Sequence, residues 1–332
     1  MPHPARPQAR ALLEKSQKIF IFGHHNPDGD CVGSQLGLGK ILEKMGKSVE
    51  YFHTGTLDST LHFVPHSDQL QNKFQPHDCD LIVRVDFSAP ARLSHRRAEF
   101  HDFFTTTPTL ILDHHASDQT PDTGNFLELK DPSSTSACER IFENLRDDRA
   151  EFLDPQIATR FLLGTITDSG GFRRGGDPTR LFSNARDLLA LGADKKFLYQ
   201  NLFSRTPLAA LKFSSTVIDR AQIRENFCRT RFSATEISDL GISKNQADLG
   251  FSQLQSTDGL EIFVRFQILS DEIRISLRSR TPEISVADLA QKLFGGGGHH
   301  AAAGAAVPLG IQDPAQLLPA LADQIFAELP KK

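Results

Sequence analysis

Short apolar runs that stop at acidic or imidazole side chains recur through the first half of the chain. Residues 18–22 precede His24-His25, residues 81–85 precede Asp86, and residues 109–112 precede Asp113-His114-His115. Such runs, alternating with helical patterns, are typical of βα units around a parallel sheet. Because ligands bind at the carboxyl ends of the strands in such sheets, we expect these side chains to meet at one edge.

The first half of the chain has the pattern of a doubly wound α/β domain. The predicted strands are 18–22, 49–52, 81–85, 109–112 and 125–129, and the predicted helices are 33–45, 134–144 and 155–167. Asp154 and Pro155 are the expected N-cap and first residue of the last of these helices.

A largely helical stretch follows, with helices predicted at 179–191, 195–203 and 208–220. From about residue 225 the pattern changes to that of a smaller α+β domain, with strands at 227–232, 261–269 and 272–279. A helix at 286–294, a Gly run, an Ala-rich strand and a helix at 314–329 complete the chain. We therefore expect a catalytic domain over 1–190, a helical connector over 191–220 and a substrate-binding domain over 221–332.

Composition is that of an ordinary globular protein and limits the partners. The 332 residues suffice for two domains of about 150 residues each. With 37 basic and 41 acidic residues the net charge is −4, and no basic arm for a long double-stranded nucleic acid is expected. Scattered cysteines indicate reduced thiols, and no signal peptide or membrane-spanning run is found. We expect a cytoplasmic protein with no membrane partner.

The first polar cluster has the spacing of metal ligands. His24-x3-Asp28-x-Asp30 directly follows a predicted strand and precedes a predicted helix. The intervening Pro27 and Gly29 favour a tight turn that presents an imidazole and two carboxylates to the sheet edge. The structural alternative is that an aspartate caps the helix and the histidine only packs.

Asp168 brings a further carboxylate to this edge. It follows the predicted helix 155–167, where the negative end of the helix dipole disfavours an acid. Carboxylates that face one another need compensating cations, so we predict two divalent metal ions. Mixed imidazole and carboxylate ligands favour Mn²⁺, with Mg²⁺ or Co²⁺ as alternatives, whereas the lack of Cys ligands disfavours structural zinc.

These residues resemble the motifs of the DHH phosphoesterase superfamily. The matching segments are His24-x3-Asp28-x-Asp30, Val85-Asp86, Asp113-His114-His115 and Thr167-Asp168-Ser169-Gly170. The run Gly295-Gly296-Gly297-Gly298-His299-His300, with Ser276-Leu277-Arg278-Ser279 before it, resembles the signature of the associated DHHA1 domain. The two-domain layout is similar to that of the NrnA type. Cys31 and Ser169 depart from the family pattern, which commonly has Ala and Thr there.

The resemblance implies a role for each matched residue. The implied metal ligands, with Asp86 bridging the two ions, are His24, Asp28, Asp30, Asp86, His114 and Asp168. His115 would act on the substrate phosphate as a catalytic residue together with Asp86, and Asp113 would orient the histidines from behind. The implied substrate-binding residues are Arg278, Gly297, Gly298 and His299.

The resemblance also implies the reaction. Short oligoribonucleotides and linear dinucleotides would be hydrolysed to mononucleotides, and 3′-phosphoadenosine 5′-phosphate (pAp) to AMP. The enzymatic alternatives are a c-di-AMP phosphodiesterase, a RecJ-like single-strand exonuclease, and a manganese pyrophosphatase or exopolyphosphatase. A non-catalytic nucleotide sensor is disfavoured because all expected ligands are present. The possibility that the protein forms a homodimer is left open.

Overall fold

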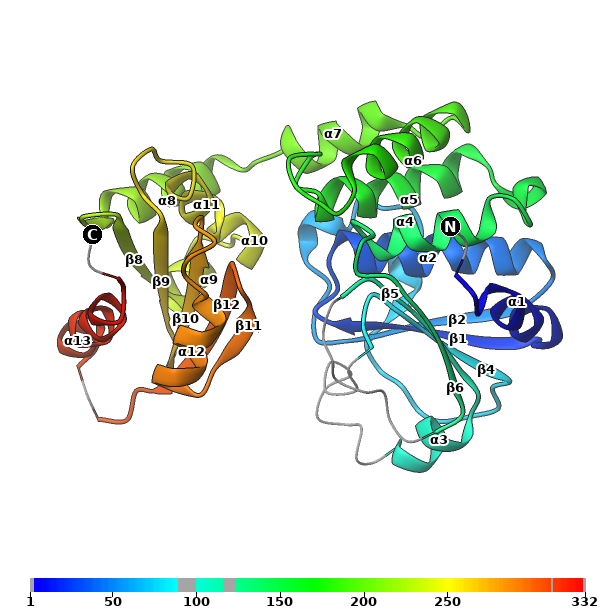
Figure 1. Cartoon of the computed structure of the whole chain (residues 1–332), viewed down its shortest axis with the longest axis horizontal. Coiled ribbons are helices and arrows are strands. Elements are labelled where there is room, and N and C mark those ends of the chain that lie inside the picture. The colour runs from blue at the N-terminus through cyan, green and yellow to red at the C-terminus, as the bar shows by residue number, and fades with distance from the viewer. Residues whose placement is uncertain (1–2, 89–99, 116–123, 312, 331–332) are drawn as a thin grey trace. The chain divides into compact units, whose positions relative to one another are not determined.

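The computed structural model describes residues 3–88, 100–115, 124–311 and 313–330 (Figure 1). Their contacts divide the chain into two compact units, Met1–Ser204 and Arg205–Lys332. This division differs from the predicted connector over 191–220. Helix α7 (Lys195–Phe203) packs on α5 (Pro155–Asp168) in the first unit, whereas α8 (Leu208–Asp219) packs on the second. The expected connector is shared between the units because its helices bury their apolar faces in different cores.

The first unit is built on a six-stranded sheet in the order β3-β2-β1-β4-β5-β6, and all its strand pairs are parallel. Its strands are β1 (Lys18–His25), β2 (Ser48–Thr54), β3 (Leu70–Gln71), β4 (Leu81–Val85), β5 (Thr109–Asp113) and β6 (Phe126–Lys130). The central strands are buried along almost their whole length, as expected for a parallel sheet covered on both faces. The predicted doubly wound α/β class is confirmed.

Helices and apolar side chains cover both faces of this sheet. The helices are α1 (Arg6–Lys15), α2 (Gly29–Lys44), α3 (His101–Thr106), α4 (Ala137–Leu145), α5, α6 (Pro178–Ala190) and α7, with short 3₁₀ turns at Ser59–Leu61, Ser67–Gln69 and Ala150–Phe152. The larger core cluster includes apolar residues of α1, α2, α4 and α5. A separate phenylalanine-rich cluster includes Phe20, Phe22, Phe52 and Phe104, with Phe103 of α3 packed against it.

Two helices begin three or more residues away from their predicted starts, and side-chain capping explains both differences. Helix α2 begins at Gly29 rather than at residue 33, because the Asp28 carboxylate accepts hydrogen bonds from the amides of Asp30 and Cys31. Helix α4 begins at Ala137 rather than at residue 134, because Ser136 is its capping residue. The predicted Asp154 cap and Pro155 start of α5 are confirmed.

The second unit is a six-stranded mixed sheet with helices. Its strand order is β11-β12-β10-β9-β8-β7, and among these pairs only β8 and β9 run parallel. Its strands are β7 (Gln222–Arg224), β8 (Phe227–Ser233), β9 (Ile262–Ile268), β10 (Glu272–Ser279), β11 (Gly297–His299) and β12 (Ala302–Pro308). Its helices are α8, α9 (Ala234–Asp239), α10 (Lys244–Ala247), α11 (Leu249–Leu254), α12 (Val286–Phe294) and α13 (Pro314–Ala327). The predicted α+β class is confirmed.

The two faces of the second sheet have separate cores. Residues of α12 and α13 pack with alternate residues of β9 and β10, while α8 and α10 form another cluster around Phe232 of β8. No helix within the described residues has both the length and the apolar character needed to cross a membrane.

Candidate metal centre

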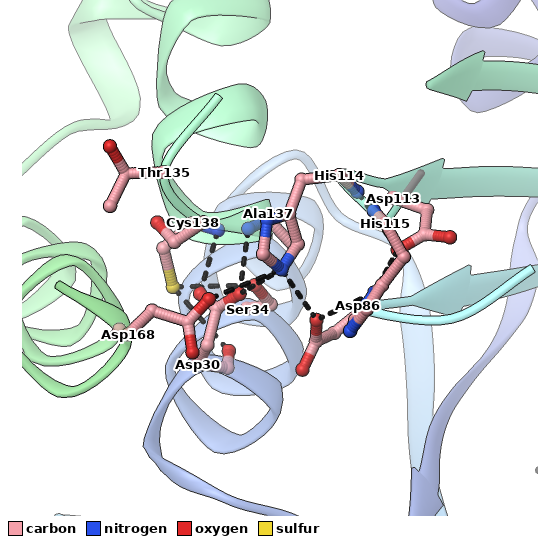
Figure 2. Close-up of polar contacts among 12 residues, drawn as sticks. Asp30, Ser34, Asp86, Asp113, His114, His115, Thr135, Ala137, Cys138 and Asp168 are labelled. Atoms are coloured by element: carbon pink, nitrogen blue, oxygen red, sulfur yellow. Dashed lines mark hydrogen bonds and ion pairs between the residues drawn. The ribbon is translucent and has the colours of Figure 1, made fainter. Parts of the chain in front are cut away.

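The polar ends of the strands converge because β1, β4 and β5 are neighbours in the sheet. Strand β1 carries His24 near its end, β4 leads into Asp86, and β5 leads into His114. Figure 2 shows Asp30, Asp86 and Asp168 around the ring of His114. The structure thus brings the sequence-predicted side chains together at one edge.

Nitrogen and oxygen atoms in this cluster lie within the distances that a shared cation would need. His114 Nε2 is 3.3 Å from Asp86 Oδ1, 3.1 Å from Asp168 Oδ2 and 3.9 Å from Asp30 Oδ2. His24 Nε2 is 3.3 Å from the other Asp86 oxygen, Oδ2, and 3.8 Å from Asp28 Oδ2. Asp86 therefore presents one oxygen to each histidine, which is the arrangement expected of a bridging carboxylate.

Close packing of α2 on α5 brings Asp168 to the cluster. A Cβ atom on Gly33 would lie 2.4 Å from the Arg160 carbonyl oxygen, and one on Gly164 would lie 2.4 Å from Asp30 Oδ1. A Cβ atom on Gly29 would lie 2.5 Å from Thr167 Cγ2. Only glycine fits at these contacts. The sequence analysis did not single out Gly164, although a glycine inside an apolar helix is a signal of close packing.

Backbone groups fix two of the side chains. Asp30 Oδ2 accepts from the Ala137 amide at 2.6 Å, and Oδ1 accepts from the Cys138 amide at 2.9 Å. The Nδ1 of His24 lies 3.0 Å from the His25 carbonyl oxygen, which can only accept, so Nδ1 carries the hydrogen. In the neutral imidazole, Nε2 is then the nitrogen whose lone pair is free to bind an ion. The anchoring of Asp30 by α4 was not predicted.

Asp28 is placed both to cap a helix and to offer an oxygen to a metal ion, the two alternatives that the sequence left open. Its Oδ1 atom caps α2, whereas Oδ2 is the atom near His24. The Asp28 side chain is 54% exposed, while the Asp30 side chain is fully buried. The capping alternative is therefore correct for one oxygen and leaves the second oxygen available.

The donor set fits divalent cations. Asp86 Oδ1 and His114 Nε2 are buried and make no hydrogen bond with any described residue. Leaving such atoms without partners costs about 1–3 kcal/mol each, and a bound cation removes that cost. Asp86–His114–His115 and Asp30–His114–Asp168 each hold potential ligand atoms within 4.8 Å of one another. Oxygen and imidazole donors of this kind suit Mn²⁺ or a similar ion.

Without a cation, protons balance the charges of the cluster. Burial disfavours the imidazolium of His24, but hydrogen bonds to Asp28 and Asp86 outweigh the effect of burial and raise the pKa of His24 to about 10. Burial likewise opposes protonation of His114, yet the Asp86 carboxylate 3.3 Å away and the charges of Asp30 and Asp168 raise the pKa of His114 to about 10. Burial and the charge of Asp86 raise the pKa of Asp30 to about 7. These shifts are typical of a site built to hold positive charge.

Asp113 lies behind the histidines and makes no close approach to the shared space. Its Oδ1 accepts from the amides of His114 and His115, at 2.8 and 3.2 Å, and lies 2.7 Å from His115 Nδ1. Ser88 donates to its Oδ2 at 2.5 Å. Although burial opposes ionisation, hydrogen bonds from His115 and Ser88 hold the pKa of Asp113 below its usual value. Ser88 is a contact that the sequence analysis missed.

Asp86 has a backbone conformation that few residues tolerate. Its φ is +65°, in the left-handed region. Aspartate and asparagine accept this conformation more readily than most other residues with side chains. Strain of this kind concentrates at functional sites, where the surrounding structure holds it in place.

The two residues that depart from the family pattern are buried beside the cluster. Cys31 has a potential ligand atom within 4.8 Å of those of His24 and Asp86. Burial, followed by the charge of Asp86, raises the pKa of its thiol well above the usual value. Ser169 is fully buried and bonds to the α5 carbonyl of Thr165 at 2.6 Å.

Two of the four predicted substrate-binding residues, Arg278 and His299, lie in one row of the second sheet. In the strand register Arg278 of β10 and His299 of β11 both pair with Ala302 of β12. Gly297, Gly298 and His299 pair with β12 as the edge strand β11. The side chain of His299 lies outside the described part of the structure.

Close backbone packing explains the glycines of this strand. A Cβ atom on Gly298, whose φ is +148°, would lie 2.6 Å from Ala303 Cα. A Cβ atom on Gly296 would lie 2.3 Å from the Gly304 carbonyl oxygen. The Gly run is therefore part of an ordered sheet edge rather than a flexible linker.

Comparison with known proteins agrees with this architecture. The model of the DHH family N-terminal domain matches residues 18–165, and that of the DHHA1 domain matches residues 232–328. The bifunctional oligoribonuclease and PAP phosphatase NrnA of Mycoplasma genitalium is 29% identical over 90% of this chain and 92% of its own. The protein of the same name from Bacillus subtilis is 25% identical, covering 87% of this chain and 89% of its own.

Solved structures show the same fold. An exopolyphosphatase-related protein from Bacteroides fragilis superposes with a TM-score of 0.86 at 21% identity, covering 97% of this chain and 95% of its own. A RecJ exonuclease bound to manganese has a TM-score of 0.52 at 16% identity, covering 99% of this chain and 96% of its own. Because both domain models match in this order, and NrnA proteins align along nearly the whole length, the chain belongs to the DHH/DHHA1 family and is of the NrnA type.

Proposed function

We propose that this protein is a metal-dependent phosphoesterase that hydrolyses short oligoribonucleotides and linear dinucleotides to mononucleotides, and pAp to AMP. The observation that carries the proposal is that Asp86 Oδ1 and His114 Nε2 lie 3.3 Å apart, buried and without a hydrogen bond to any described residue, among further carboxylates. The substrate class rests on the NrnA relatives, whose names state oligoribonuclease and PAP phosphatase activities. Four unpaired cysteines, three of them buried, suit a reducing compartment such as the cytoplasm.

The residues divide into those that hold two ions and those that meet the substrate. We assign the ions to the six ligands His24, Asp28, Asp30, Asp86, His114 and Asp168, with Asp86 shared. Mn²⁺ is the proposed ion, as in the RecJ structure of similar fold. When bound, such ions activate water and stabilise charge on the transferred phosphoryl group.

The remaining residues position and bind the substrate in this proposal. Asp113 and Ser88 hold the ring of His115, which we assign to the substrate phosphate. Arg278, Gly297, Gly298 and His299 of the second unit are assigned to nucleotide binding. A guanidinium suits this role because its planar fork can make two charge-assisted hydrogen bonds to one phosphate.

A substrate panel with Mn²⁺ tests the proposal. It contains short RNAs, linear dinucleotides, pAp, c-di-AMP, pyrophosphate and long single-stranded DNA, and it measures released mononucleotide and phosphate. We expect the highest kcat/KM for short RNAs or linear dinucleotides, together with turnover of pAp. Preferential cleavage of c-di-AMP, pyrophosphate or long DNA would show that the substrate assignment is wrong.

Arg278→Ala is expected to raise KM for short RNA about 10–100-fold while changing kcat much less, because a lost charge-assisted hydrogen bond weakens capture by about 1.5–3 kcal/mol. Steady-state kinetics with Mn²⁺ measure this effect. Arg274→Ala is the matched control, since Arg274 lies on the same strand and pairs with Glu272 at the surface. An unchanged kcat/KM in the Arg278 variant would exclude the contact.

Asp113→Asn is expected to lower kcat about 10–100-fold with little loss of bound metal, because a carboxylate behind a functional histidine sets its orientation and basicity. The amide oxygen can still accept from the two histidine backbone amides. Kinetics and metal analysis on the same sample separate the two effects. Loss of metal in proportion to loss of turnover would instead indicate that Asp113 acts by positioning the metal ligands.

A further inference from the structure

A cavity of about 180 Å³ lies in the second unit, between the first turn of α13 and the sheet. It is near the β7 edge, and the predicted nucleotide-binding strand β11 forms the opposite edge of that sheet. Its lining includes Arg220, Arg229 and Arg231, and no acidic side chain is among the described residues that line it. No residue assigned to the proposed reaction contributes to this cavity.

Strand geometry gathers two of these arginines. Arg229 and Arg231 are two positions apart on β8, so both side chains project from the same face of the strand. Phe227 lies on that face too and belongs to the core cluster that includes residues of α13. Phe266 of β9, paired with Arg231 in the parallel register, is buried and forms part of the cavity wall.

Most of the positive charge at this cavity has no acidic partner. Arg220 donates from Nη2 to Glu236 at 2.7 Å. Arg229 bonds only to uncharged oxygens, the side chain of Gln222 at 2.9 Å and the Leu318 carbonyl at 3.3 Å. Arg231 is exposed and makes no hydrogen bond or ion pair with any residue that the structure describes. Two guanidinium groups therefore retain uncompensated charge.

The nearby helix contributes little direct hydrogen bonding. Asp313 caps α13 by accepting from the Ala315 amide through its side chain, at 2.9 Å. Its carbonyl oxygen accepts from the amides of Gln316 and Leu317. Since these amides are already bonded, the arginines are the cationic groups that remain for an anion.

We propose that this cavity binds the phosphate group of a small molecule, either a phosphate monoester or inorganic phosphate. Phosphate oxygens match the planar fork of arginine, and a dianion relieves the repulsion between cations that line one cavity. The apolar rings of Pro314 and Pro319 beside the arginines could contact the group that carries the phosphate. No residue of the metal centre lines this cavity, since every lining residue belongs to the second unit.

Calorimetry on the full-length, metal-free protein tests this proposal with inorganic phosphate, AMP and adenosine as probes. Chelation of metal ions keeps the metal centre from contributing. We expect saturable binding of phosphate and AMP and none of adenosine. Tighter binding of AMP than of phosphate would identify a monoester as the preferred ligand, and equal binding would identify the phosphate group alone. Absence of saturable phosphate and AMP binding would overturn the proposal.

Arg231→Gln is expected to weaken phosphate and AMP binding about tenfold. This change leaves no other residue unpaired, so the melting temperature is expected to stay unchanged. The matched control is Arg224→Gln, since Arg224 is an exposed arginine of the same unit that pairs with Asp323 outside the cavity. Equally weakened binding in both variants would indicate general charge attraction and would overturn the proposal of a specific site. Binding that persists in Arg231→Gln but disappears in Arg278→Ala would overturn it as well.

Discussion

Asp86→Asn is expected to lower kcat/KM for short RNA by about 10³-fold or more and to reduce bound Mn²⁺. The loss corresponds to about 4 kcal/mol of transition-state stabilisation, a magnitude expected when a cation that stabilises phosphoryl charge is displaced. Each Asp86 oxygen lies 3.3 Å from a different histidine, so one substitution affects both halves of the cluster.

Asparagine is the informative replacement at this position. It keeps the shape of the side chain and accepts the positive φ of Asp86, whereas alanine would add backbone strain. The measurements are kcat/KM, metal content after gel filtration and melting temperature. Asp147→Asn is the control, because Asp147 is 66% exposed and belongs to the same unit. Full turnover with a full metal complement in Asp86→Asn would exclude the bridging role.

Removal of divalent metal is expected to abolish turnover and to make stability strongly dependent on pH. In the metal-free protein His24 and His114 have pKa values of about 10, against 6.5 in an unfolded chain. The folded state therefore binds these protons more tightly, and its stability falls as pH rises from 6.5 toward 10. The pKa of Asp30 is about 7 instead of 3.8, so its contribution to the stability of the folded state also falls as pH rises between those two values.

Other carboxylates do not reverse this trend above about pH 5. The pKa values of Asp86 and Asp113 are lowered, so their stabilising contribution is complete above the unfolded value of 3.8 and is lost only in acid. Bound Mn²⁺ replaces the protons and binds more tightly as they dissociate. The melting temperatures of the Mn²⁺-loaded and chelated proteins should therefore diverge as pH rises.

We expect this difference in melting temperature to widen by about 5 °C or more between about pH 6 and about pH 8.5. Differential scanning calorimetry on both forms checks it, and titrations elsewhere in the molecule cancel in the difference. Asp86→Asn is the matched variant, since it removes the carboxylate that both histidines share, and the widening should largely disappear. A constant difference across this range in the unaltered protein would contradict the proposed proton and metal exchange.

Much of the site could be predicted because its residues directly follow apolar strands. In a parallel sheet the strand ends share one edge, so His24, Asp86 and His114 were expected to be close before any distance was known. Helix boundaries were less predictable. The start of α2 depends on which oxygen of Asp28 bonds to which amide, and local pattern cannot distinguish a capping carboxylate from a ligand.

The contacts that hold Asp30 could not be predicted, because they join segments far apart in the chain. Its carboxylate is fixed by amides of α4, more than a hundred residues away, and its approach to α5 requires the missing Cβ of Gly164. How the helical region after residue 190 divides between the two units could not be predicted for a similar reason. Which core each helix joins is decided by packing, since amphipathic helices have no local marker of their partner.

The sequence by itself determined the classes of both units, the residue types at the strand ends and the resemblance to the DHH/DHHA1 family, because each depends on local periodicity or on spacing along the chain. Only the tertiary structure decided which oxygens face His114, how Asp28 divides its two oxygens, and that Arg220, Arg229 and Arg231 line one cavity. These features arise from contacts between distant segments, and their free energies depend on burial and distance, which composition and spacing do not contain.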